Sequence, residues 1–174
     1  MAARARSVAG SMGSEALTQE TSERAPAATV AEVLQRLDDS WSAFLTGLDD
    51  LTEDQLLEPN AVGEWSLKDL LGHIAFWDDL GRENAALALS GNARQFDDFE
   101  ALNQADHAAR QGRTLAEERA AMYQAHAALV ADLEERAELD AAAIDEAIAG
   151  STYEHYDEHL ADIRAWRERR GVQA

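Results

Sequence analysis

The sequence has 174 residues, of which 46% are hydrophobic and none is cysteine. This composition is typical of one globular domain and excludes disulfides, Fe–S clusters and cysteine-ligated zinc. With 15 Lys and Arg against 34 Asp and Glu, the formal net charge is −19, which opposes binding to phosphate backbones and anionic lipids. We therefore expect neither nucleic acid nor a membrane as a partner. Because no segment has the pattern of a membrane span or a secretory signal, we expect a cytoplasmic protein.

The first 28 residues differ in composition from the rest of the chain. Residues 1–28 are rich in Ala, Ser, Arg and Glu, and Leu17 is their one apolar side chain larger than valine apart from methionine. Such a segment buries too little apolar surface to repay the entropy of folding. We therefore expect residues 1–28 to be a disordered tail and residues 29–174 to form the domain.

Four helix starts are predicted by capping boxes, in which Ser or Thr is followed three residues later by an acidic residue. The four pairs are Thr29 with Glu32, Ser66 with Asp69, Thr114 with Glu117, and Ser151 with Glu154. Each pair precedes apolar residues at helical spacing. Together with the abundance of alanine, the boxes predict an all-α fold, a four-helix bundle with long inter-helix connections.

In chain order, the first helix is predicted over residues 30–50 and the second from Leu67 to a stop at Gly91. The third is predicted over residues 115–133, and the fourth from Thr152 into an arginine-rich end. The connection over residues 91–113 contains a predicted short helix around Phe99 and Leu102. A further helical piece is predicted over residues 141–148.

Three of the five histidines are predicted to enter the bundle interior. His155 and His159 share one face of the fourth helix, and His73 lies on the apolar face of the second. Three imidazoles from two helices suit a divalent ion with an open coordination position. The alternative is three core histidines, each hydrogen-bonded to a nearby Asp or Tyr, because an unpaired buried ring nitrogen is costly. The spacing alone leaves both interpretations open.

The sequence predicts different roles for the other two histidines. His126, on the apolar stripe of the third helix, is a candidate fourth ligand or ligand partner, but the favoured interpretation is a hydrogen-bonded core histidine. His107 is expected to be exposed. Trp77 and Trp166 are expected to form core, with the alternative that they wall a substrate pocket that also takes Asn103 from the short helix.

Residues 155–159 also form the inverted zincin pattern H-x-x-E-H. A metalloprotease is not expected, because little sequence follows His159 to supply the remaining ligand and Glu158 is predicted to turn toward solvent.

Two segments resemble the DinB-like four-helix bundles, a superfamily that includes the N-terminal domain of mycothiol-dependent maleylpyruvate isomerases. Residues 63–79 read GEWSLKDLLGHIAFWDD and resemble the segment that opens the second helix of those bundles. Residues 152–166 read TYEHYDEHLADIRAW and resemble their last-helix histidine motif. Combined with FDDFEALNQADHAARQGRTLAEE at residues 96–118, they look closest to the branch that includes colibactin self-resistance proteins.

The resemblance implies a metal, often zinc or nickel, held by His73, His155 and His159, with Glu158 or Asp162 available as a base. It implies thiol-dependent transferases or isomerases acting on small electrophiles, with a low-molecular-weight thiol such as bacillithiol or mycothiol. In the colibactin branch it implies a hydrolase without a clear metal requirement. Three hypotheses stay open: a metal-dependent enzyme, a metal-free protective hydrolase or sequestering protein, and a non-catalytic binding module. A small-molecule substrate is expected, and a homodimer is left open.

Overall fold

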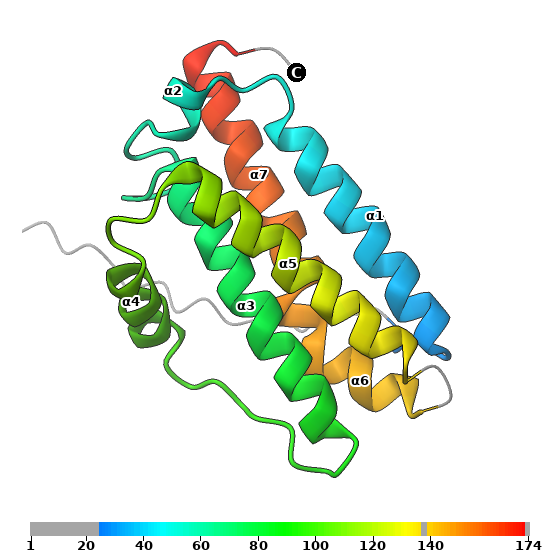
Figure 1. Ribbon diagram of the computed structural model, residues 1–174. Helices are drawn as coiled ribbons and strands as arrows, with labels where there is room; N and C mark the ends of the chain where they lie inside the picture. Colours follow the sequence, from blue (N-terminus) through cyan, green and yellow to red (C-terminus); the bar gives the residue numbers. More distant parts are fainter. Residues whose placement is uncertain (1–24, 137–138, 173–174) are drawn as a thin grey trace, which may run out of the picture.

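The computed structural model describes residues 25–136 and 139–172, and its regular elements within these ranges are all helices (Figure 1). This confirms the all-α prediction. The elements are α1 (Val30–Leu48), α2 (Glu53–Leu56), α3 (Leu67–Ala88), α4 (Phe99–Ala109), α5 (Leu115–Glu134), α6 (Ala141–Ile148), the 3-10 helix η1 (Ala149–Ser151) and α7 (Tyr153–Arg170). No helix in these ranges combines the length and apolar character needed to cross a bilayer.

The four longest helices form the body of the molecule, with α3 packed along α5 and α1 packed along α7 (Figure 1). Helix α6 packs against α3, and α4 lies beside α3 on the outside of the body. The structure therefore has seven α-helices in its described part, where the sequence predicted four and two short pieces. The additional one, α2, begins after Thr52, whose side chain forms a complete capping box with Gln55.

Three of the four predicted capping boxes make cap contacts in the structure. Ser66 and Thr114 form the full reciprocal box at the starts of α3 and α5. Thr29 accepts a hydrogen bond from the Glu32 N–H at the start of α1, while the Glu32 carboxylate accepts one from the N–H of Ala28. These three helices start where the sequence predicted.

The Ser151 box does not form, although the fourth helix begins at Tyr153, one residue from the predicted Thr152. Ser151 belongs to η1, and its hydroxyl donates to the carbonyl of Ile148. Helix α7 begins one residue after Thr152, whose hydroxyl donates to the same carbonyl and caps no helix N–H. The packing of η1 on α3 turns both hydroxyls into the molecule, so they are used to close α6 rather than to open α7.

The end of the expected tail packs on the domain. Ala27 is 2% exposed, and its N–H donates to the carboxylate of Asp145 on α6 at 2.9 Å. The same carboxylate pairs with Arg36 of α1 at 3.0 Å. Residues 25–28 are therefore in contact with the domain, whereas the rest of the predicted tail, residues 1–24, lies outside the described residues.

Gly81 sets the distance between α3 and the start of α7. A Cβ atom at this position would lie 2.8 Å from Ser151 Oγ and 3.0 Å from Thr152 Cγ2. We expect Gly81→Ala to destabilise the fold by about 1–3 kcal/mol, because overpacking forces the two backbones apart. Urea denaturation measures this loss. Ser151→Gly in the same chain is expected to restore part of the stability, and an additive double mutant would contradict the contact.

Candidate metal centre

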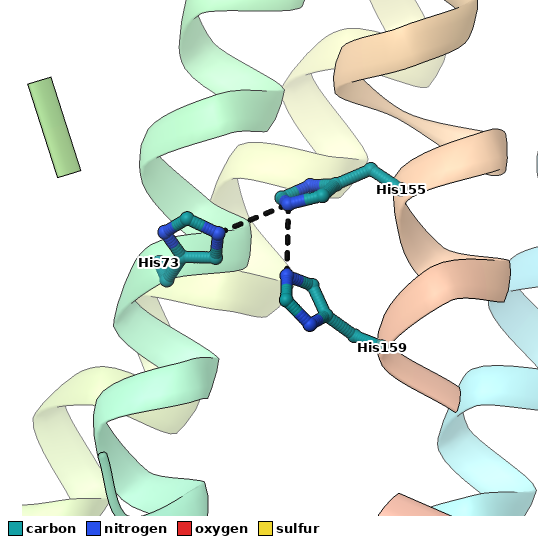
Figure 2. A group of neighbouring side chains, drawn as sticks. All are labelled: His73, His155 and His159. Atoms are coloured by element: carbon teal, nitrogen blue, oxygen red, sulfur yellow. Dashed lines mark hydrogen bonds between the residues drawn. The ribbon is translucent and has the colours of Figure 1, made fainter. Parts of the chain in front are cut away.

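Three histidines meet between α3 and α7 (Figure 2). His155 lies in the middle, with its Nε2 2.9 Å from Nε2 of His73 and 2.9 Å from Nε2 of His159. One ring nitrogen from each histidine lies within 4.8 Å of the other two, so the group could hold a metal ion. The predicted convergence of the three rings on one point is therefore confirmed.

Helix geometry explains why the rings converge. His155 and His159 are four residues apart on α7 and therefore project from the same face. His73 projects from α3 toward that face and is 5% exposed, and His159 is 8% exposed. Each ring is in aromatic contact with the other two.

Burial keeps two of these imidazoles neutral at pH 7. Desolvation, with smaller effects from His159 and Arg110, lowers the pKa of His73 to about 3. Desolvation also lowers the pKa of His155 well below its ordinary value, and the imidazoles of His159 and His73 add to the effect. Because metal ligation requires neutral imidazole, His73 and His155 can offer lone pairs without first losing protons.

Asp162 fixes the orientation of His159. Its carboxylate Oδ2 lies 2.9 Å from His159 Nδ1, one turn along α7. When Nδ1–H donates to this carboxylate, the lone pair of neutral His159 lies on Nε2, which faces the other two histidines. His73 differs, because its buried Nδ1 atom has no hydrogen-bond partner among the described residues.

The expected pocket residues are only partly brought together. Trp77 is buried beside His73 and His155, with ring centroids 6.3 and 6.0 Å away. Its Nε1–H donates to Asn103 Oδ1 at 2.9 Å, which brings α4 to the site. Trp166, in contrast, is 2% exposed in the hydrophobic core, and the ring contacts of the described residues do not connect it to the histidines. The structure therefore does not place Trp166 at this site.

Glu158 is exposed, as predicted from its position on α7. Together with His155 it lines a groove of about 850 Å³, whose walls also include residues 94–97 and the end of α6. This volume lies in the range of small-molecule sites. Glu158 and His155 of the three-histidine group therefore face the same groove.

His126 lies outside the three-histidine group. Its ring stacks on Trp41 at a centroid distance of 3.8 Å, and its Nδ1 lies 3.2 Å from the hydroxyl of Tyr156. Tyr156 in turn donates to the buried carboxylate of Asp78. His126 is thus the hydrogen-bonded core histidine that the sequence favoured.

Stability is expected to fall between pH 6.5 and pH 4 because of His126. Burial lowers the pKa of His126 to about 4, so over this interval the unfolded chain binds a proton that the folded chain does not. By linkage this costs roughly 3 kcal/mol at the acidic end. Urea denaturation at pH 7.5 and pH 4.5 should show a smaller loss for His126→Phe than for the native protein. An equal loss would contradict the assignment.

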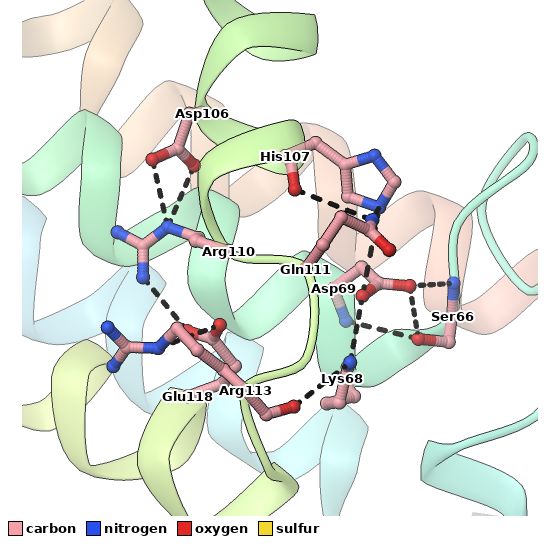
Figure 3. A network of polar contacts seen from close by, with 9 residues as sticks. All are labelled: Ser66, Lys68, Asp69, Asp106, His107, Arg110, Gln111, Arg113 and Glu118. Carbon is pink, nitrogen blue, oxygen red and sulfur yellow. Dashed lines mark hydrogen bonds and ion pairs between the residues drawn. The ribbon is translucent and has the colours of Figure 1, made fainter.

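Two features near the site escaped the sequence analysis. Trp65 makes an edge contact with His73 and stacks on His107, whose side chain is one-third exposed. Arg110, at the end of α4, bonds Asp106 and the buried Glu118, which ties α4 to α5 (Figure 3). Glu118 lies between exposed residues on α5 and belongs to no apolar periodicity, so residue spacing could not predict its burial.

The chain was compared with known proteins. The family model described as the DinB superfamily matches residues 36–163. A solved structure, the crystal structure of an uncharacterised protein from Escherichia coli UTI89, is similar with a TM-score of 0.66 and 17% identity. The match covers 84% of this chain and 96% of that one, and at this identity it shows the fold alone. A search of curated proteins found no match.

Proposed function

Since the chain belongs to the DinB superfamily, we propose that His73, His155 and His159 hold a divalent metal ion, zinc or nickel. We propose further that the protein acts at this centre on a small electrophilic metabolite, with a low-molecular-weight thiol or water as nucleophile. One observation carries the proposal: three ring nitrogens from two helices lie within 4.8 Å of one another. Structural histidines have no need to converge on a single point.

The donor set fits a catalytic rather than a structural ion. Three nitrogen ligands leave one position of a tetrahedral site for substrate or nucleophile. A divalent ion bound there would polarise an electrophile or lower the pKa of a thiol or water. The ring nitrogens of the three histidines would bind the ion. Asp162 holds the ring of His159 in the orientation that lets Nε2 act as a ligand.

The remaining residues have distinct proposed roles. Glu158 is the carboxylate exposed to the groove, and we assign it the role of proton acceptor. Asp162 is bonded to His159 and is therefore a positioning residue. Trp77, held by Asn103, forms an apolar wall that limits water near the reacting atoms.

The proposed reaction is the transfer of a thiol to the carbon of the electrophile. The thiol sulfur forms a bond to the electrophilic carbon, and the thiol proton passes to the Glu158 carboxylate. The leaving group departs with its bonding electron pair, or, where a strained ring opens, the released ring atom takes up the proton. With water in place of the thiol, the same proton path gives hydrolysis.

The test compares zinc-loaded, nickel-loaded and chelator-treated protein against a panel of electrophiles, with and without bacillithiol, mycothiol or glutathione. Products are followed by mass spectrometry. Thiol conjugation or hydrolysis that requires the metal and falls strongly in Glu158→Gln supports the proposal. His107→Ala, which leaves the three proposed ligands in place, is the matched control and should retain activity.

The other hypotheses predict different results in the same assay. A metal-free protective hydrolase would turn over an electrophile equally well after chelation. A sequestering protein or binding module would retain the electrophile unchanged. Activity that persists in a triple variant of His73, His155 and His159 to alanine would contradict this location for the site.

A further inference from the structure

The groove that reaches His155 has an aromatic wall. Trp77, Phe96 and Phe99 lie together, with ring centroids 5.5 Å apart for Trp77 and Phe96 and 5.6 Å apart for Trp77 and Phe99. Phe99 is 43% exposed, although it is a large apolar residue at the first position of α4. Aromatic faces open to solvent attract cations through the negative potential of the ring, and quaternary ammonium groups are bound in this way.

The charged side chains along the groove also favour a cation. Asp97, Glu146 and Glu158 are exposed carboxylates in its lining. Arg94 is the one basic residue other than His155 among the described lining residues, and it pairs with Glu83 at 3.2 Å. Carboxylates in a concave site with low-dielectric walls raise the local concentration of cations and repel anions.

The groove is also held at a fixed width. Asn84, which is 3% exposed, donates through Nδ2 to the carbonyl of Arg94 and to the carbonyl of Ala147 on α6. Its Oδ1 accepts from the N–H of Arg94 at 2.6 Å. One side chain therefore ties both walls together, and a ligand does not have to order them on binding.

His155 connects this groove to the metal centre. It lines the groove, while its Nε2 meets the other two histidines. A molecule lying along the aromatic wall therefore has its other end next to the metal centre.

From the aromatic wall, the carboxylates and the adjoining histidines we infer that the substrate carries a cationic amine or ammonium group. This group lies in the groove against Trp77, Phe96 and Phe99, while the reacting group reaches the metal centre. The inference rests on the proposed function and narrows it. Phosphorylated and polycarboxylate substrates are disfavoured, because the groove offers no free basic side chain among its described residues.

The test uses choline and its neutral carbon isostere, 3,3-dimethylbutan-1-ol, with the full chain. The two probes differ in one atom, and a quaternary nitrogen cannot ligate a metal. Any preference for choline over the neutral alcohol therefore arises from the groove. Binding is followed by NMR through the indole N–H of Trp77. Choline is expected to bind about tenfold more tightly at low ionic strength, and the difference should shrink as salt is added.

Two charge variants localise the effect. Asp97→Asn with Glu146→Gln removes two groove carboxylates and is expected to abolish most of the preference for choline. Asp54→Asn with Glu134→Gln removes the same charge from exposed positions outside the groove and should retain the preference. Equal affinity for the two probes, no shift of the Trp77 signal with choline, or equal effects of the two double variants would overturn the inference.

The metal content of the same samples separates the two proposals. Protein that takes up zinc but shows no preference for choline contradicts the cationic substrate and leaves the metal centre standing. Protein that prefers choline but takes up no zinc contradicts the metal centre, while the cation preference of the groove stands.

Discussion

Replacing His155 with alanine is expected to abolish metal binding. His155 is the histidine that contacts both of the others through Nε2, so its loss leaves His73 and His159 without the ring between them. Removal of a hydrogen-bond partner of a metal ligand already costs 10–100-fold in affinity, so the loss of a ligand should cost at least about 100-fold. Elemental mass spectrometry of protein purified without chelator or affinity tag measures the zinc and nickel content.

The matched controls for this variant are the two histidines outside the group. His107→Ala and His126→Phe should keep the metal content of the native protein, although His126→Phe disturbs the core hydrogen bond to Tyr156. A His155→Ala protein that retains a full equivalent of metal would place the ion elsewhere on the chain.

The second large effect is expected at the buried carboxylate that joins α4 to α5. Glu118 is 1% exposed and accepts from Arg110 at 2.8 Å, with Arg113 at 3.1 Å (Figure 3). Arg110→Met leaves Glu118 buried with the partly exposed Arg113 alone. Breaking a buried pair from one side is costly, so we expect the free energy of unfolding to fall by about 3 kcal/mol in urea denaturation.

A paired substitution distinguishes a charge effect from a packing effect. Arg110→Met together with Glu118→Leu removes both charges and is expected to recover much of the lost stability. Arg136→Met breaks a partly exposed i, i+4 pair with Asp132, and it should cost less than about 1 kcal/mol. A loss in Arg110→Met no larger than in Arg136→Met would contradict the importance of the buried pair.

Local sequence rules predicted the features that depend on local geometry. The starts of α3 and α5 follow from side chains within one helical turn, and the shared face of His155 and His159 follows from the helical repeat. The meeting of His73 with these two required the additional inference that both faces are apolar and turned inward. That inference was correct because a helix buries its apolar stripe.

Features that depend on tertiary packing were missed or wrong. Ser151 has the sequence of a helix cap, but η1 packs on α3 and directs its hydroxyl to Ile148. Ala27 was predicted to lie in the tail, but its N–H donates a hydrogen bond to the carboxylate of Asp145, more than a hundred residues away. For η1 the packing partner is α3 and for Ala27 it is Asp145, both distant in sequence, and spacing rules carry no information about them.

The most direct test of the metal centre is X-ray absorption spectroscopy of the zinc-loaded protein. We expect three imidazole nitrogens at about 2.0–2.1 Å from the ion and one further light ligand. The number of imidazoles should fall to two or fewer in His73→Ala, because that ligand comes from a different helix than the others. A native spectrum dominated by carboxylate oxygen, or one that His73→Ala leaves unchanged, would contradict the claim that His73, His155 and His159 bind the ion together.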